Sequence, residues 1–172
     1  MSFITQNYKL FILLIALLSM PAAGAYAQGG QSTPEELGKS KAAATQANDK
    51  AALKALIHPE VLKHMQENNP QKLEELLQAW TQITIPENYM FGVKPVSEIS
   101  EYDAKTQSMN VTGQTMHFPI PPTHFMVFVV EQEQTVKVGG KEEKRMMKIP
   151  LGVDPIRQDK GKWYILLPVV QQ

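Results

Sequence analysis

The chain has 172 residues, with 17 Lys and Arg against 17 Asp and Glu, and no cysteine. Its length fits one ordinary domain, because domains commonly run to about 100–200 residues. Zero formal charge argues against a nucleic-acid binder, which normally carries a basic surface, and the absence of cysteine excludes disulfides and thiolate metal sites.

The first 27 residues have the pattern of a secretory signal peptide. Lys9 precedes a nine-residue apolar run, 10–18, and small residues follow as far as Ala25–Tyr26–Ala27, a small-x-small signal peptidase site. Ala23–Gly24–Ala25 offers a cut two residues earlier. The apolar run is much shorter than the ~20 residues of a membrane-spanning helix. We therefore predict cleavage after about Ala27, a periplasmic or secreted protein, and no membrane association afterwards; an uncleaved anchor is the alternative.

After a polar, flexible leader at residues 28–33, the sequence predicts a helix from 34 to about 47. Thr33 and Glu36 form a capping box around Pro34, which tolerates the first helical turn. Asn48–Asp49 predicts a break, because Asn tolerates the left-handed backbone that ends a helix and Asp caps the next one. A second helical piece is then expected as far as Ile57.

Two more helices are expected to begin at His58–Pro59–Glu60 and at Asn69–Pro70. The later one should end at Pro86. It carries an apolar stripe on one side, as an amphipathic helix does, formed by Leu73, Leu76, Leu77, Trp80 and Ile83.

From Tyr89 onward the pattern is typical of β-strands. Short strands are expected at 93–100, 109–111 and 116–118, followed by a stiff connection that contains Pro119, Pro121 and Pro122. Residues 124–130 are apolar at successive positions, which predicts a central strand covered on both faces.

A charged hairpin is expected after this central strand. Residues 131–138 should leave the core and turn at Gly139–Gly140, and residues 145–153 should return. We expect Pro155 to interrupt the returning strand, and residues 162–170 to close the sheet after a turn at 159–161. The returning strand should place four apolar side chains on one face, namely Met147, Ile149, Leu151 and Val153.

Helices followed by strands predict one α+β domain over residues 34–172, with the N-terminal helices packed on one face of a curved antiparallel sheet. Two stretches resemble the nuclear transport factor 2-like superfamily, the cystatin-like cone that includes ketosteroid isomerase-type enzymes. Residues 47–60 (ANDKAALKALIHPE) resemble the break between that family's first two helices. Residues 156–165 (IRQDKGKWYI) are similar to its last hairpin. The resemblance implies a pocket between the cone and the helices, and frequent homodimerisation.

Enzymes of that superfamily use Asp or His bases and Tyr or Asp donors, and the resemblance carries none of these onto particular residues here. His117 and His124 are the candidate catalytic residues, because an antiparallel pair across the proline-rich turn would bring their imidazoles together. The alternative is two histidines at solvated strand ends. Trp80, Tyr89 and Phe91, together with the two histidines, are candidates to line a ligand pocket; for the aromatic residues, ordinary core packing is the alternative.

No cofactor motif is recognisable, and the histidine pair lacks an obvious third ligand for a metal. The first hypothesis is therefore an exported accessory module that binds a small apolar ligand or a protein partner, forms a homodimer, and has no legible catalytic machinery. A small proton-transfer or hydrolytic enzyme is the second hypothesis, and it requires His117 or His124 to face a cavity. The third is an assembly subunit that docks through the charged hairpin at 131–148.

Overall fold

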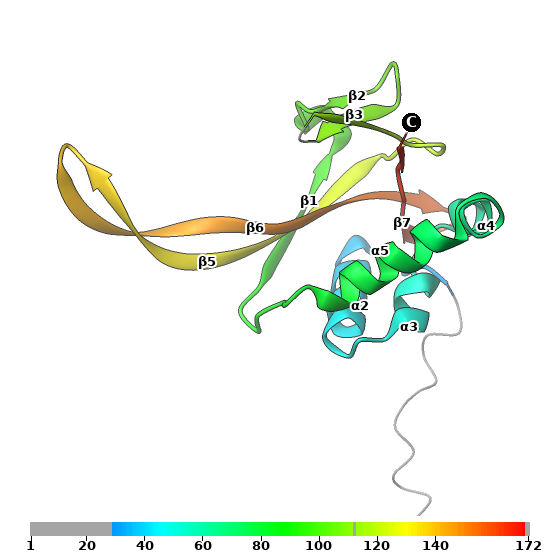
Figure 1. Cartoon of the computed structure of the whole chain (residues 1–172), viewed down its shortest axis with the longest axis horizontal. Coiled ribbons are helices and arrows are strands. Elements are labelled where there is room, and N and C mark those ends of the chain that lie inside the picture. The colour runs from blue at the N-terminus through cyan, green and yellow to red at the C-terminus, as the bar shows by residue number, and fades with distance from the viewer. Residues whose placement is uncertain (1–28, 112, 171–172) are drawn as a thin grey trace, which may run out of the picture.

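The computed structural model describes residues 29–111 and 113–170, in which helices precede strands as predicted (Figure 1). The predicted signal peptide lies outside the described residues. The helices are α2 (Pro34–Gln46), α3 (Lys50–Ala55), α4 (Pro59–Asn68) and α5 (Pro70–Gln82).

The helix starts follow from the capping residues. The hydroxyl of Thr33 accepts a hydrogen bond from the backbone N–H of Glu36 at 3.1 Å, and Asp49 caps α3 by accepting from the N–H of Ala52 at 2.9 Å. Asn48 has a φ of 54°, the left-handed conformation expected between α2 and α3. The helix predictions are confirmed to within a few residues, and local side-chain caps account for the starts of α2 and α3.

The main sheet is antiparallel in the order β1-β5-β6-β7. Its strands are β1 (Met90–Pro95), β5 (His124–Val138), β6 (Lys141–Asp159) and β7 (Lys162–Ile165). Helix α2 packs closely on one face of this sheet. The approach is so tight that a Cβ atom added at Gly38 would lie 3.0 Å from the sulfur of Met126 on β5. Phe125, the neighbour of Met126, is fully buried on the opposite face. The start of β5 is therefore covered on both sides, as predicted.

A second antiparallel sheet covers that opposite face near Phe125, in the order β2-β3-β4-β8. Its strands are β2 (Tyr102–Asp103), β3 (Ser108–Val111), β4 (Gln114–His117) and β8 (Val169–Val170). The rings of Tyr102 and Phe118 lie 5.8 and 6.4 Å from the ring of Phe125.

The α+β class with antiparallel strands is confirmed, but the strands divide between two sheets where a single sheet was expected. The prolines after Phe118 allow the chain to leave the second sheet before β5 begins. The C-terminal segment was expected to finish in one sheet, but it crosses between the two: Ile165 pairs with Ile156 of β6, and Val169 pairs with His117 of β4.

Two expectations for β6 are wrong. The strand continues through Pro155, whose carbonyl accepts from the N–H of Leu166 at 2.8 Å. The proline nitrogen points to that same side, just beyond the last β6–β7 pair, so the β5–β6 ladder loses no hydrogen bond. A bulge also shifts the register: Phe128 faces Gly152 and Val129 faces Pro150. Leu151 is the extra residue, and Met147 and Val153 consequently lie on opposite faces.

Strand β1 also differs from the prediction, which placed it at 93–100. It starts at Met90 and ends at Pro95, where the 3₁₀-helix Val96–Glu98 follows.

Residues 131–148 form a two-stranded arm that projects away from the helices and from the second sheet (Figure 1). Gly139 and Gly140 make its turn with φ values of 59° and 83°, which glycine adopts without strain. Apart from the half-buried Val136, its described side chains are exposed. The predicted hairpin and turn are confirmed, and this segment is here called the arm.

Candidate functional site

The aromatic candidates from the sequence meet at the interface between helices and main sheet. Trp80 of α5 is 9% exposed. The rings of Tyr89 and Phe91 lie 6.1 and 5.9 Å from the ring of Phe128 on β5. All of them contribute to the main apolar core, so the structure gives these residues a packing role.

A buried ion pair lies within this interface. Nζ of Lys41 on α2 is 2.5 Å from Oδ2 of Asp154 on β6, and their side chains are only 7% and 8% exposed. The same ammonium group lies 4.5 Å from the ring centroid of Trp80 and 5.6 Å from that of Phe128, within cation–π distance. Its charge is therefore compensated by one carboxylate and two aromatic faces.

Sequence reasoning missed this pair, although one signal was present. Leu37, Lys41 and Thr45 are spaced by four residues, so they share one face of α2, and the structure buries all three. A lysine between two buried residues on such a face indicates that a partner lies opposite.

His117 and His124 do not form the expected antiparallel pair. His117 belongs to the second sheet, where it faces Ser108 and Val169. His124 begins β5 in the main sheet, and its ring contacts that of Trp163 at 5.3 Å. Its Nδ1 lies 3.1 Å from the hydroxyl of Thr123. The prolines that separate the two strands place the two histidines in different sheets.

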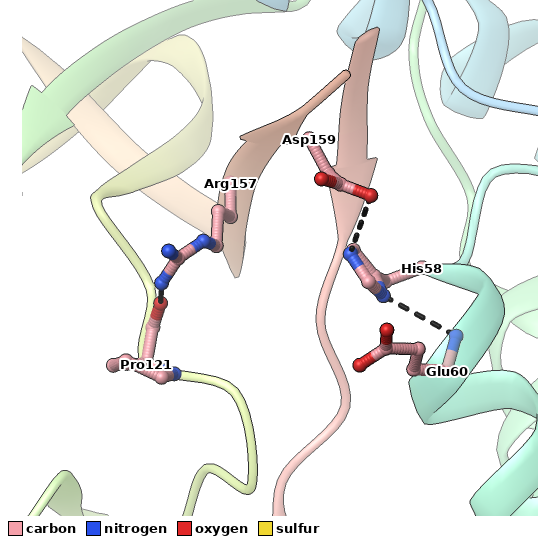
Figure 2. Close-up of polar contacts among 5 residues, drawn as sticks. All are labelled: His58, Glu60, Pro121, Arg157 and Asp159. Atoms are coloured by element: carbon pink, nitrogen blue, oxygen red, sulfur yellow. Dashed lines mark hydrogen bonds and ion pairs between the residues drawn. The ribbon is translucent and has the colours of Figure 1, made fainter.

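His58 is a buried histidine with both ring nitrogens engaged (Figure 2). It is 3% exposed, and Nδ1 accepts from the backbone N–H of Glu60 at 3.3 Å, which caps α4. Nε2 faces Oδ2 of Asp159 at 3.6 Å. The ring of Tyr164 also lies beside it in a T-shaped arrangement, with centroids 5.3 Å apart.

Burial lowers the pKa of His58, and the nearby carboxylate of Asp159 opposes this effect. Since Nδ1 accepts a hydrogen bond in the neutral ring, Nε2 carries the proton and points at Asp159. This arrangement fixes the start of α4 against the β6–β7 turn and leaves no free nitrogen to act as a base. The sequence predicted the helix start at His58 but not its carboxylate partner.

Figure 2 also shows how the proline-rich connection is attached. The guanidinium of Arg157 on β6 donates to the carbonyl of Pro121 at 2.9 Å. This contact links the connection between the two sheets to the same end of β6 that carries Asp159.

A cleft of about 860 Å³ lies between the α4–α5 corner and the second sheet. Its lining combines side-chain amides with apolar groups and has one charged residue of each sign. Its lining residues include Met65, Asn68, Asn69, Leu76, Gln114, Met116 and Val169. None of the five predicted site residues lines this cleft, although Met116 is the chain neighbour of His117.

The arm is covered with charges that pair across its two strands. Lys144 lies 2.8 Å from Glu133, and Lys148 lies 4.0 Å from Glu131. Such exposed pairs contribute little stability. Two large apolar side chains are exposed beside them, Met146 at 63% and Met147 at 42%.

Within the described ranges, no cluster of His, Asp and Glu could hold a metal ion. Among the helices that the structure describes, none has the length and apolar character of a membrane span. Comparison with protein-family models, with curated proteins and with solved structures gives no match.

Proposed function

We propose that this protein is an exported, non-enzymatic accessory module that binds a protein partner through its arm. The observation that carries the proposal is the projection of residues 131–148 away from the body (Figure 1). A two-stranded hairpin alone is marginally stable in water, and this one exposes Met146 and Met147. A partner that covered the arm would stabilise it.

The remaining parts of the proposal follow the sequence. The leader would direct the chain to the periplasm or outside the cell, and the mature protein would form homodimers. The order of elements, with helices on one face of the main sheet, supports a cone of the nuclear transport factor 2-like type. The second sheet would be a departure from that plan.

A small-ligand module is the second candidate function, and the cleft of about 860 Å³ favours it. Asn68, Asn69 and Gln114 supply hydrogen-bonding groups beside the apolar Met65 and Met116. Binding sites commonly combine apolar walls with a few polar groups in this way.

Native mass spectrometry of the protein isolated from its source tests both candidates. The comparison variant replaces residues 131–148 with Asn-Gly, which closes a hairpin at the paired residues Val130 and Ile149. We expect the intact protein to carry a second polypeptide. The trimmed variant should not carry it, because the proposed docking site has been removed. A retained small molecule present on both forms would favour the ligand candidate, and a partner that survives trimming would contradict docking through the arm.

A further inference from the structure

The β5 edge of the arm has unpaired backbone groups. On one side of β5, β1 pairs only as far as Val129, and β6 lies on the other side throughout the arm. Among the described strands, none lies beside residues 131–137 on the β1 side. An exposed strand edge of this kind is a template for pairing with another chain.

We infer that this edge binds a second copy of the same chain, with the two β5 strands antiparallel about a twofold axis at Gln134. The inference rests on the proposed function and names its partner. Pairing about Gln134 sets Glu131 against the partner subunit's Lys137, and Lys137 against the partner subunit's Glu131. The neutral Gln134 faces its own copy at the centre.

The charges of the arm fit this register. Within each arm Lys148 faces Glu131, and Lys137 faces Glu142. In the joined four-stranded sheet, the residues that lie side by side across the four strands near each end of the pairing are, in order, Lys148, Glu131, the partner subunit's Lys137 and the partner subunit's Glu142. Charges of alternating sign along a row are favourable, whereas like charges directly opposite each other are destabilising.

The charged outer part of the β6 edge does not have this self-complementarity. Residues 141–145 are all charged, with the sequence KEEKR. A twofold antiparallel pairing centred on any of them places a charge opposite its own copy. A pairing centred on Met146 would set Lys144 against the partner subunit's Lys148. Charge repulsion therefore discourages pairing centred on residues 141–146 of β6, whereas the β5 edge has a charge-complementary register about Gln134.

A four-stranded arm also removes the weakness of a two-stranded one, because three or more strands are normally needed for stability outside a core. Seven paired residues per chain bury less area than a standard protein interface. We therefore expect a monomer–dimer equilibrium that depends on concentration.

Sedimentation equilibrium of the purified protein and three variants tests the inference. Lys137→Glu should weaken the dimer about tenfold, because it sets like charges opposite each other at two symmetric positions. The double variant Glu131→Lys with Lys137→Glu should restore dimerisation by exchanging the two signs. Lys144→Glu is the matched control: it removes the arm's ion pair with Glu133 but lies on β6, so dimerisation should persist.

The double variant separates pairing between chains from effects inside one arm. Within a single arm it places the introduced lysine opposite Lys148 and the introduced glutamate opposite Glu142, so an intrachain effect would make it worse than Lys137→Glu. A protein that is monomeric at every concentration, or a double variant no better than the single one, would overturn the inference. If a monomeric protein still loses a different polypeptide on trimming of the arm, the second copy and the proposed homodimer are refuted, whereas docking of a partner through the arm stands.

Discussion

His58 shows how one side chain can have a structural role that residue type alone does not reveal. A histidine is the usual candidate for a base near neutral pH, yet here both ring nitrogens are engaged, one by the N–H of Glu60 and the other facing Asp159. The half-buried histidines that the sequence favoured, His117 and His124, lie in different sheets. The sequence showed which residues could act as a base, but it did not show which of these histidines would be buried, and burial decides the role of each.

The lowered pKa of His58 predicts a pH-dependent stability. Below the ordinary histidine pKa of about 6.5 the unfolded chain binds a proton that the folded chain resists, so stability is full above that pH and falls as the pH decreases towards the folded pKa. His58→Asn keeps a capping acceptor without titrating. In urea unfolding, the advantage of the natural protein over this variant should therefore shrink between pH 7 and pH 5.

Asp159→Asn sharpens that test. Removing the carboxylate takes away the interaction that raises the pKa of His58, so the pH-dependent loss should extend to lower pH. A difference between the natural protein and His58→Asn that stays constant with pH would contradict the assignment.

At the scale of elements, local signals were predictive and pairing between elements was not. Thr33, Asn48 and Asp49 act on their own turns, and each gave a correct helix boundary. The bulge at Leu151 depends on how β6 faces β5. Pro150 and Gly152, residue types that often accompany bulges, flank it in the sequence, but they do not by themselves give the register. The interruption predicted at Pro155 was wrong for the same reason. A proline in a strand removes a hydrogen bond only where a neighbouring strand would accept one, and at Pro155 this depends on where β7 ends.

The Lys41–Asp154 pair attaches α2 to β6 and gives a prediction at this scale. Lys41→Met would leave a carboxylate buried without a partner, so we expect it to lower the free energy of unfolding by about 3–5 kcal/mol. The double variant Lys41→Met with Asp154→Leu removes both charges and should recover most of that loss. Urea unfolding of the two single variants and the double one measures the coupling; additive losses would show that the pair does not act as a unit.

At the scale of the whole molecule, the sequence predicted the α+β class but not the division into two sheets. The prolines between Phe118 and His124 were correctly interpreted as a stiff connection. What they connect depends on long-range contacts, namely the rings around Phe125 and the pairing of Val169 with His117. The charges of residues 131–148 could likewise be read from the sequence, whereas the projection of this hairpin away from the body is seen only in the folded structure (Figure 1).

The leader gives the last prediction, which concerns where the molecule acts. Ala25 and Ala27 are the two small residues of the expected signal peptidase site, and Ala25 would also be the last residue before the earlier alternative cut. When the full chain is expressed in a Gram-negative host, intact-mass analysis of the periplasmic fraction should find a chain that starts at Gln28. Ala27→Arg should shift the start to Tyr26, because only the earlier site remains.

Ala25→Arg should block both cuts, because it places a large charged side chain in each of them, and the chain should then stay membrane-associated. Gln31→Arg lies beyond both sites and serves as the control that should be processed normally. A natural chain that keeps Met1 and stays in the cytoplasm would refute export, and with it the compartment in which the arm is proposed to meet its partner.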